Sequence, residues 1–389
     1  MPCETENNRD KTSTQKKTKL DLPKGIPPLT SLYLYISGSC NLACKHCWIA
    51  PEFQQNPENG KFVKPEYVKE AIIQAKPLGL GSVKLTGGEP LLHPQFKELV
   101  NIIEKENIRF TIETNGILID KNMADFLKNR EKKPFISVSV DGACAKTHED
   151  LRGVQGSFEQ AINGIKHLVK AGFRPQLICT LHKGNVSEMK DIVELAQKIG
   201  CGSVKFNHVQ EVGRGDTFAH EQGLEISEII KLYEIVEKEI IPESKITIFF
   251  DIPFAFYPIK RFLSGNLGKC NVLNILGMLS EGELSLCGIG TTVPELIYGH
   301  MKDNNLKEVW CKSAGLTLLR KQIPEKLEGI CANCIHKDFC LGTCVANNFF
   351  RTGKLNAPYG FCEQAEKLNL FPISRQKKNK KKLEKNILI

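Results

Sequence analysis

Three cysteines near the start of the chain constrain its fold and chemistry more than any other feature. They lie in the stretch Cys40-Asn-Leu-Ala-Cys44-Lys-His-Cys47-Trp48, directly after a strand-like run over residues 31–36. Three thiolates can hold three irons of a cubane cluster and leave the fourth iron open, whereas a structural metal site normally closes its last position with a fourth protein ligand. The spacing therefore predicts an iron–sulfur cluster with a vacant coordination site.

The setting of the cysteines supports metal binding rather than disulfide formation. The chain has 15 cysteines in 389 residues, with apolar and charged contents of 41% and 25% that are ordinary for a globular protein. No apolar run is long enough to span a membrane, and the polar N-terminus has no signal-peptide core. A cytoplasmic location and no membrane partner are therefore expected. In such a reducing compartment, cysteines are more often metal ligands or redox groups.

The net charge of +9 is concentrated at the two ends of the chain. Residues 1–28 are expected to form a polar tail and residues 371–389 a basic tail, because runs of lysine are usually solvated. A nucleic-acid partner is therefore not expected.

The middle of the chain alternates regularly between strand and helix patterns. Each expected strand is followed by a helical segment, and the strands cover residues 31–36, 82–85, 109–113, 135–140, 176–181 and 203–208. This alternation predicts an α/β fold with a parallel sheet, open or partly closed as a barrel. In such folds the chemistry lies at the carboxyl ends of the strands. The cysteine loop, Asn115 and Asp141 all fall at that edge.

The second expected strand ends in Gly87-Gly88-Glu89-Pro90. Paired glycines allow a ligand to approach the backbone closely, and the carboxylate of Glu89 could receive an ammonium group.

With this turn and the cysteine loop together, the chain resembles the radical S-adenosylmethionine (SAM) superfamily. The resemblance implies a partial (β/α)6 TIM-like barrel in which Cys40, Cys44 and Cys47 hold a [4Fe–4S] cluster. SAM would chelate the open iron through its amino and carboxylate groups, and its reductive cleavage would give a 5′-deoxyadenosyl radical that abstracts a substrate hydrogen. The family pattern places an aromatic residue before the third cysteine, whereas this chain has His46 there and Trp48 after it.

The resemblance also implies which residues contact SAM. The Gly87-Gly88-Glu89 turn would contact the amino group, Ser139 and Asp141 would lie near the ribose hydroxyls, and Arg152 would pair with the carboxylate. The further implied position is Asn115, at the end of the third strand. Taken singly, each has a simpler explanation: Glu89 as a surface carboxylate, Asp141-Gly142 as a turn and Arg152 as a solvated helix-end residue.

A second set of cysteines occupies the C-terminal third. The run Cys331-x2-Cys334-x5-Cys340-x3-Cys344 is flanked by Cys270, Cys287 and Cys362. Sulfur-only ligation from short loops suits zinc or an iron–sulfur cluster. The simplest alternative is a zinc ribbon that uses only the central run.

The whole stretch from Cys270 to Cys362 resembles the SPASM extension of radical SAM peptide-modifying enzymes. The resemblance implies two auxiliary [4Fe–4S] clusters with interleaved ligands. One would use Cys270, Cys287 and Cys344, and the other would use Cys331, Cys334, Cys340 and Cys362. The first lacks a local fourth cysteine, for which Ser264 stands in the usual place and Cys311 is an unproven substitute. The implied domains are a radical SAM core over 29–255 and a SPASM domain over 256–370.

These features predict an enzyme that modifies a ribosomally made peptide, for instance by a thioether or another cross-link. A flavodoxin- or ferredoxin-type reductant is the expected electron donor. Only a short polar stretch precedes the first strand, so leader recognition is expected to use the core, the tails or a separate protein.

Other functions remain open on the sequence alone. The same chemistry could act on a tetrapyrrole side chain, a quinone-cofactor precursor or a sulfatase-type protein, although Gly288 replaces the acidic residue that follows the corresponding cysteine in sulfatase-maturing relatives. A non-catalytic iron–sulfur electron carrier would not need the Gly-Gly-Glu-Pro turn. A zinc-bound nucleic-acid module is favoured only by the basic tails.

Overall fold

A ten-stranded sheet forms the frame of the computed structural model, which describes residues 20, 22–54, 59–263 and 270–377. The strand order is β12-β11-β10-β1-β4-β5-β6-β7-β8-β9, and every neighbouring pair from β10 to β9 is parallel. The predicted α/β class with a parallel sheet is confirmed. The parallel strands are β1 (Ser31–Ser37), β4 (Ser82–Gly87), β5 (Arg109–Thr114), β6 (Phe135–Ser139), β7 (Gln176–Leu181), β8 (Ser203–His208), β9 (Thr247–Phe250) and β10 (Ile275–Met278).

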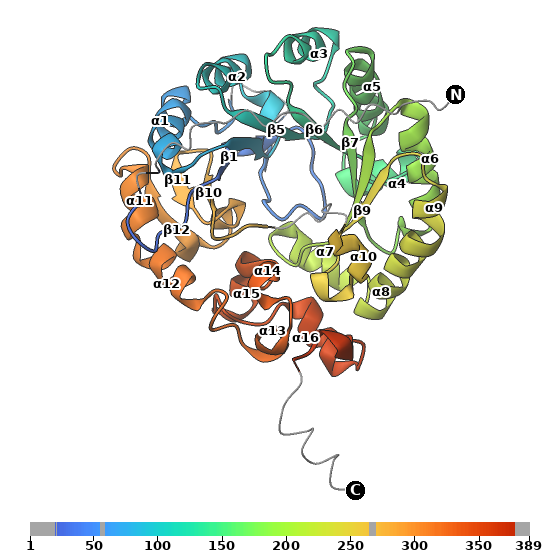
Figure 1. Cartoon of the computed structure of the whole chain (residues 1–389). Helices are drawn as coiled ribbons and strands as arrows, with labels where there is room; N and C mark the ends of the chain where they lie inside the picture. Colours follow the sequence, from blue (N-terminus) through green and yellow to red (C-terminus); the bar gives the residue numbers. More distant parts are fainter. Residues whose placement is uncertain (1–19, 21, 55–58, 264–269, 378–389) are drawn as a thin grey trace, which may run out of the picture.

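Helices cover the outer face of this curved sheet (Figure 1). They are α1 (Pro65–Ala75), α2 (Phe96–Lys105), α3 (Lys121–Lys128), α5 (Ser157–Lys170), α6 (Met189–Ile199) and α8 (Ile226–Ile235), which continues as a π-helical turn over Val236–Ile240 and into α9 (Ile241–Glu243). Their starts follow local chemistry: Pro65 opens α1, and the Asp120 carboxylate accepts a hydrogen bond from the Met123 N–H at the start of α3.

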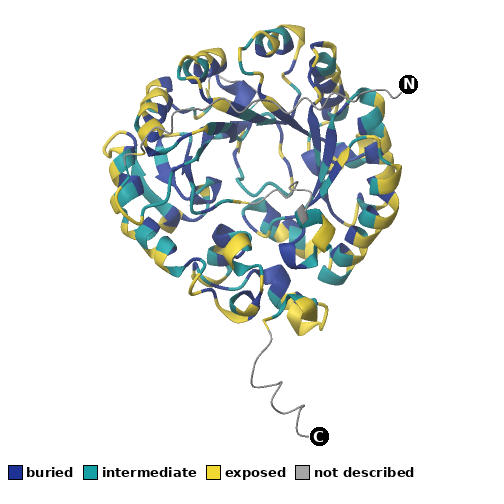
Figure 2. Cartoon of the chain, viewed as in Figure 1, coloured by how far each residue is buried: buried dark blue, intermediate teal, exposed yellow. Residues whose placement is uncertain are grey.

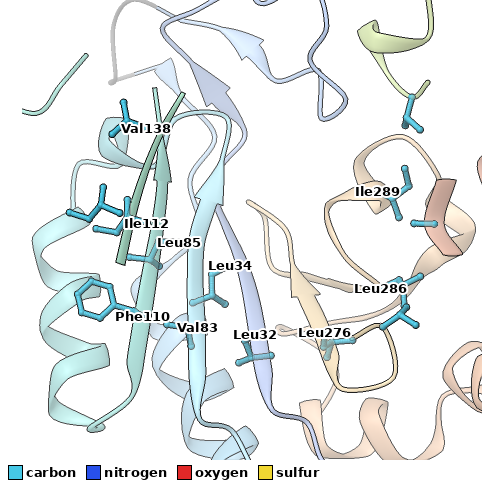
Figure 3. Packing of buried hydrophobic residues seen from close by; sticks show 14 of the residues in the cluster. Leu32, Leu34, Val83, Leu85, Phe110, Ile112, Val138, Leu276, Leu286 and Ile289 are labelled. Atoms are coloured by element: carbon cyan, nitrogen blue, oxygen red, sulfur yellow. The ribbon is translucent and has the colours of Figure 1, made fainter. Parts of the chain in front are cut away.

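The core lies between the sheet and these helices. Alternate strand residues such as Leu34, Leu85 and Ile112 are buried on neighbouring strands (Figure 3). Helix α2 adds Phe96 and Ile103 from its inner face, and burying each such side chain stabilises the fold by roughly 1.5–3 kcal/mol. Figure 2 shows the result as buried strands inside and exposed outer helix faces.

The sheet continues past the predicted domain boundary at residue 255. Strand β10 pairs in parallel with β1, with Leu32 opposite Leu276. Strands β11 (Glu283–Ser285) and β12 (Ile297–His300) then add in antiparallel order. The division into a core and a C-terminal domain remains a prediction, since one sheet contains strands from both.

The C-terminal helices begin on the outer side of β12, where the first of them lies next to α1 (Figure 1). The last four lie between the two ends of the sheet, beside α7 (Arg214–Gln222) and α10 (Ile259–Leu263). In chain order, the C-terminal helices are α11 (Leu306–Lys312), α12 (Ala314–Gln322), α13 (Gly329–Asn333), α14 (Lys337–Cys340), α15 (Val345–Thr352) and α16 (Gly360–Lys367). Buried Trp310 anchors this part to the start of the chain, because its indole N–H donates to the Pro27 carbonyl at 3.0 Å.

The described ends of the chain are packed where tails were predicted. Leu22 and Ile26 pack against the core, and the Arg375 guanidinium donates to the carbonyls of Ala255 and Tyr257 at 3.3 and 3.0 Å. Within the described part of the chain, no helix combines the length and apolar character needed to cross a membrane.

Candidate active site at the carboxyl ends of the strands

The cysteine loop leaves the carboxyl end of β1, where the structure brings its three thiols together. Cys40 and Cys44 are buried in one cluster with Leu42, and Cys47 packs against it. Burial raises the pKa of Cys40, and the nearby carboxylate of Glu89 and the thiol of Cys44 raise it further. Thiols in such surroundings stay protonated until a metal centre binds them as thiolates, so binding is expected to release protons.

Neighbouring elements hold the loop in place through its backbone. The N–H groups of Ala43 and Lys45 donate to carbonyls at the end of α4 (Ala145–Arg152) at 3.1 and 2.9 Å. From α7, the Arg214 guanidinium donates to the carbonyls of Cys44 and Pro51 at 3.0 and 3.2 Å. Arg214 was not among the predicted site residues, because nothing in the sequence indicates that the start of α7 meets this loop.

A buried ion pair lies directly beneath the loop. The Arg152 Nε lies 2.6 Å from the Asp141 Oδ2, and the Arg152 Nη1 donates to the Cys44 sulfur at 3.5 Å. Burial raises the pKa of Asp141, but the charge of Arg152, two neighbouring histidines and a backbone N–H together hold that pKa below its usual value. Asp141 and Arg152, predicted as separate SAM contacts, thus pair with each other here, and Arg152 also places a positive charge beside Cys44.

The Gly87-Gly88-Glu89 turn packs against the start of the cysteine loop. The N–H groups of Gly88 and Glu89 donate to the carbonyls of Ser37 and Ser39 at 2.7 and 2.9 Å. A Cβ on Gly88 would lie 2.2 Å from the Ser39 carbonyl oxygen. The close contact with the chain's own backbone therefore requires a glycine at this position, whether or not a ligand also binds here.

Glu89 is fully buried, and its carboxylate accepts three hydrogen bonds. The donors are the Leu91 N–H at 3.0 Å, the Thr114 hydroxyl at 2.7 Å and the Asn115 N–H at 2.8 Å. Burial raises the pKa of Glu89 to about 7 in spite of these donors. The surface-carboxylate explanation is therefore wrong, and the turn joins the ends of β4 and β5.

Asn115 and Ser139 both lie at the predicted edge. The Asn115 side-chain amide donates to the Asn41 side chain at 2.7 Å and lies 4.0 Å from the Cys40 sulfur. Ser139 is the last residue of β6. The structure therefore gathers Asn115 and Glu89 at the Cys40 side of the loop, and Asp141 and Arg152 at the Cys44 side.

The seven C-terminal cysteines fall into two groups of neighbours. Burial raises the pKa of Cys362, and the thiols of Cys331, Cys340 and Cys334 raise it further. These four cysteines line one cavity of about 320 Å³. Among the described residues, no three His, Cys, Asp or Glu side chains lie close enough to hold a single metal ion.

The remaining cysteines form the other group. Burial raises the pKa of Cys287, and the thiols of Cys344 and Cys270 raise it further. Both groups therefore contain the residues that the resemblance implies. Ser264 lies outside the described residues, and Cys311 lies on α11, where its thiol interacts electrostatically with Arg320.

Comparison with known proteins identifies the fold and its chemistry. Residues 34–196 match the model of the Radical SAM superfamily. They form a radical SAM domain. This segment contains the cysteine loop, the Gly-Gly-Glu-Pro turn, Asp141 and Arg152, so the chain is a radical SAM enzyme. The superfamily implies a [4Fe–4S] cluster and SAM as cofactors.

The radical SAM domain and the region after it both have relatives of known activity. An AdoMet-dependent heme synthase of Methanosarcina barkeri is 27% identical over 84% of this chain and 94% of that protein. The mycofactocin maturase MftC of Mycobacterium tuberculosis is 24% identical over 88% of this chain and 84% of that protein. The crystal structure of Streptococcus suis SuiB bound to S-adenosylmethionine has the same fold, with a TM-score of 0.69, 21% identity, and coverage of 87% of this chain and 77% of that one.

The inner face of the radical SAM barrel carries charged residues that the sequence did not single out. Lys84 and Glu113 pair at 2.7 Å across β4 and β5, on the face opposite the core. The Lys84 ammonium also lies 4.6 Å from the centre of the Tyr33 ring. Strand alternation places these residues on one face, but the pairing depends on the strand register, which the sequence does not give.

An aromatic pair lies between the cysteine loop and the C-terminal group formed by Cys270, Cys287 and Cys344. Trp48 follows Cys47, and its ring lies 6.3 Å from that of Tyr35 in an edge-on arrangement. Burial raises the pKa of Tyr35, and the neighbouring thiol of Cys287 raises it further. Tyr35 of β1 thus lies between Trp48, next to the cysteine loop, and Cys287, which follows β11.

Proposed function

We propose that this radical SAM enzyme abstracts a hydrogen from a ribosomally made peptide and thereby installs a modification such as a thioether or another cross-link. The observation that carries the proposal is the combination of a SAM-type cysteine loop with two further thiol groups beside the same barrel. Maturases such as MftC, which match across most of this chain, support the choice of a peptide substrate. A flavodoxin- or ferredoxin-type reductant in the cytoplasm would supply the electrons.

The residues of the loop fit a [4Fe–4S] cluster. Cys40, Cys44 and Cys47 converge, and no other cysteine of the described residues belongs to their cluster, which leaves one iron for SAM. When bound, the cluster and SAM supply the 5′-deoxyadenosyl radical. The chain itself would fix the loop through Arg214, balance the negative charge at Cys44 with Arg152, and exclude water by burying Glu89 and Asp141.

Residues at the strand ends would bind SAM. Gly87, Gly88 and Glu89 would contact its amino group, and a cation there would favour the charged form of the Glu89 carboxylate, whose pKa burial raises to about 7. Asn115, Ser139, Asp141 and Arg152 are the further proposed contacts. To contact the SAM carboxylate, the guanidinium of Arg152 would have to pair with that carboxylate and with Asp141 at the same time.

The two C-terminal thiol groups would hold auxiliary [4Fe–4S] clusters. Cys331, Cys334, Cys340 and Cys362 would complete one site, and the pocket that all four line supports this assignment. Cys270, Cys287 and Cys344 would leave one iron of the other open. That iron could take a substrate thiolate or amide, which suits a cross-linking reaction.

A second candidate function keeps the fold and changes the substrate. Three AdoMet-dependent heme synthases are 26–28% identical over 84–88% of this chain. A tetrapyrrole side chain would then provide the reacting C–H bond.

Anaerobic incubation with SAM, reductant and substrate tests both candidates. The peptides encoded beside the gene and a carboxylated tetrapyrrole serve as parallel substrates, and 5′-deoxyadenosine and substrate mass are measured. The proposal expects 5′-deoxyadenosine together with a mass change in a peptide, and a Cys44→Ala variant that forms neither. A mass change only in the tetrapyrrole would establish the second candidate, and SAM cleavage by Cys44→Ala would exclude both.

A further inference from the structure

A cleft of about 620 Å³ lies between the end of β8 and the C-terminal helices. One wall is formed by the end of β8 and the residues that follow it up to Glu211, which brings one carboxylate to the cleft. Apolar residues of α7 and α8, including Ile226 and Ile229, line it further. The opposite wall comes from α15 and from the start of α16, where Asn347, Arg351 and Phe361 face the cleft. The lining is therefore apolar over part of its area and polar elsewhere.

The guanidinium of Arg351 is the unusual group in this cleft. Its Nη2 lies 3.3 Å from the Glu363 carboxylate, whereas its Nη1 is buried without a hydrogen-bond partner. A buried N–H of a charged group without an acceptor costs free energy, which a ligand oxygen would recover. A Cβ on Gly360 would lie 1.8 Å from this Nη1, so the guanidinium occupies space that only a glycine leaves open.

The cleft lies between the strand ends and both C-terminal thiol groups. Asn347 donates its backbone N–H to the Cys344 sulfur at 3.4 Å. Tyr359 lines the cleft and donates its N–H to the Cys331 sulfur at 3.4 Å. On the other wall, His208 is the last residue of β8, at the catalytic edge of the sheet. A molecule bound here would therefore contact residues next to both C-terminal thiol groups and the carboxyl end of β8.

We propose that this cleft binds an acidic segment of the substrate peptide, whose carboxylate pairs with Arg351. Guanidinium and carboxylate form charge-assisted hydrogen bonds, and the apolar residues of α7 and α8 suit the flanking side chains. The inference rests on the proposed peptide function and adds to it a residue that selects the substrate.

Binding of two labelled peptides to the full-length, anaerobically reconstituted protein tests the proposal. The probes are acetylated, fluorescein-labelled pentapeptides, Leu-Ala-Glu-Ala-Leu and Leu-Ala-Gln-Ala-Leu, and fluorescence anisotropy reports binding. The wild-type protein is expected to bind the glutamate peptide about tenfold more tightly, because a charge-assisted hydrogen bond to a guanidinium is stronger than one from a neutral amide. Arg351→Gln should remove this preference.

Three further variants separate a ligand-binding role from a structural one. Glu363→Gln leaves the charge of Arg351 in place and frees its second nitrogen, so the preference should persist or increase. Gly360→Ala should weaken it by displacing the guanidinium. Lys354→Ala removes a positive charge from the same region outside the cleft, where Lys354 pairs with Glu328 at 3.3 Å, and should leave the preference unchanged. If Arg351 only braced α15 against α16, Arg351→Gln and Glu363→Gln would lower both affinities alike.

Equal binding of the two peptides by the wild-type protein would overturn the inference. So would Arg351-dependent binding of a tetrapyrrole carboxylate such as coproporphyrin in the absence of any glutamate preference. The assay needs no turnover, so its failure is distinct from failure of the proposed function. Arg351-dependent peptide binding without any peptide modification would leave the cleft assigned and the reaction wrong.

Discussion

Glu89 is a residue of the site whose charge depends on its surroundings. It is fully buried and satisfied by three donors, yet burial raises its pKa to about 7. In the protein without cofactors, the folded state therefore holds a proton that the unfolded chain loses near its ordinary pKa of 4.5. The stability that this proton contributes to the folded state is fully present below the unfolded pKa of 4.5 and is lost as the pH rises from there through about 7.

Glu89→Gln is expected to remove this pH dependence. Relative to the variant, the free energy of unfolding of the wild-type protein should fall by about 3 kcal/mol between pH 5 and pH 8. Urea denaturation of both cofactor-free proteins at several pH values measures the difference. Burial lowers the pKa values of His46 and His148 to about 4, but these groups are common to both proteins and cancel. Parallel pH curves would contradict the prediction.

The residues that the sequence revealed are those whose chemistry depends on spacing along the chain. Cys40, Cys44 and Cys47 are close because three residues and two residues separate them. The Asp141–Arg152 pair and the burial of Glu89 depend instead on contacts between elements. A sequence motif can name such residues but does not show which of them already have partners.

At the scale of elements, the junction between the end of β4 and the start of the cysteine loop positions the site. Gly88 approaches the backbone of Ser39, the residue before Cys40, more closely than any side chain would allow. The glycine therefore fixes the distance between the turn and the loop, and substitution there should affect both stability and cluster binding.

Gly88→Ala is expected to destabilise the cofactor-free protein by about 1–3 kcal/mol, because the added methyl group would overlap a backbone carbonyl. Gly81→Ala is the matched control, since a Cβ there meets only the Thr30 carbonyl at an ordinary 4.0 Å. Thermal unfolding compares the two, and iron content after reconstitution should fall only in Gly88→Ala. Equal stability of the two variants would show that the loop can move aside.

The elements themselves were largely predictable. All six expected strands are present, because buried parallel strands and amphipathic helices leave clear periodic patterns. Strand β9, which follows the six expected strands, extends the sheet after β8. The pairing of β10 with β1 was not predicted, since it joins residues more than 240 positions apart and no local pattern specifies it.

Across the whole molecule, the two C-terminal thiol groups interleave along the chain. Cys340 and Cys344 are separated by three residues, yet Cys340 lies with Cys331, Cys334 and Cys362, whereas Cys344 lies with Cys270 and Cys287. A zinc ribbon built from the central run would instead place Cys340 and Cys344 in one site. The interleaving therefore makes the number of sites measurable.

Removing these cysteines singly and in pairs should distinguish two clusters from one site. With three [4Fe–4S] clusters the wild-type protein should hold about twelve irons and little zinc, and Cys340→Ser or Cys344→Ser should each lose about four. The pair Cys340→Ser and Cys344→Ser should lose about eight, whereas Cys334→Ser and Cys340→Ser, from one group, should together lose only about four. Metal analysis after anaerobic reconstitution gives these numbers. Stoichiometric zinc, or equal losses from both pairs, would mean that the seven thiols do not form two iron–sulfur sites.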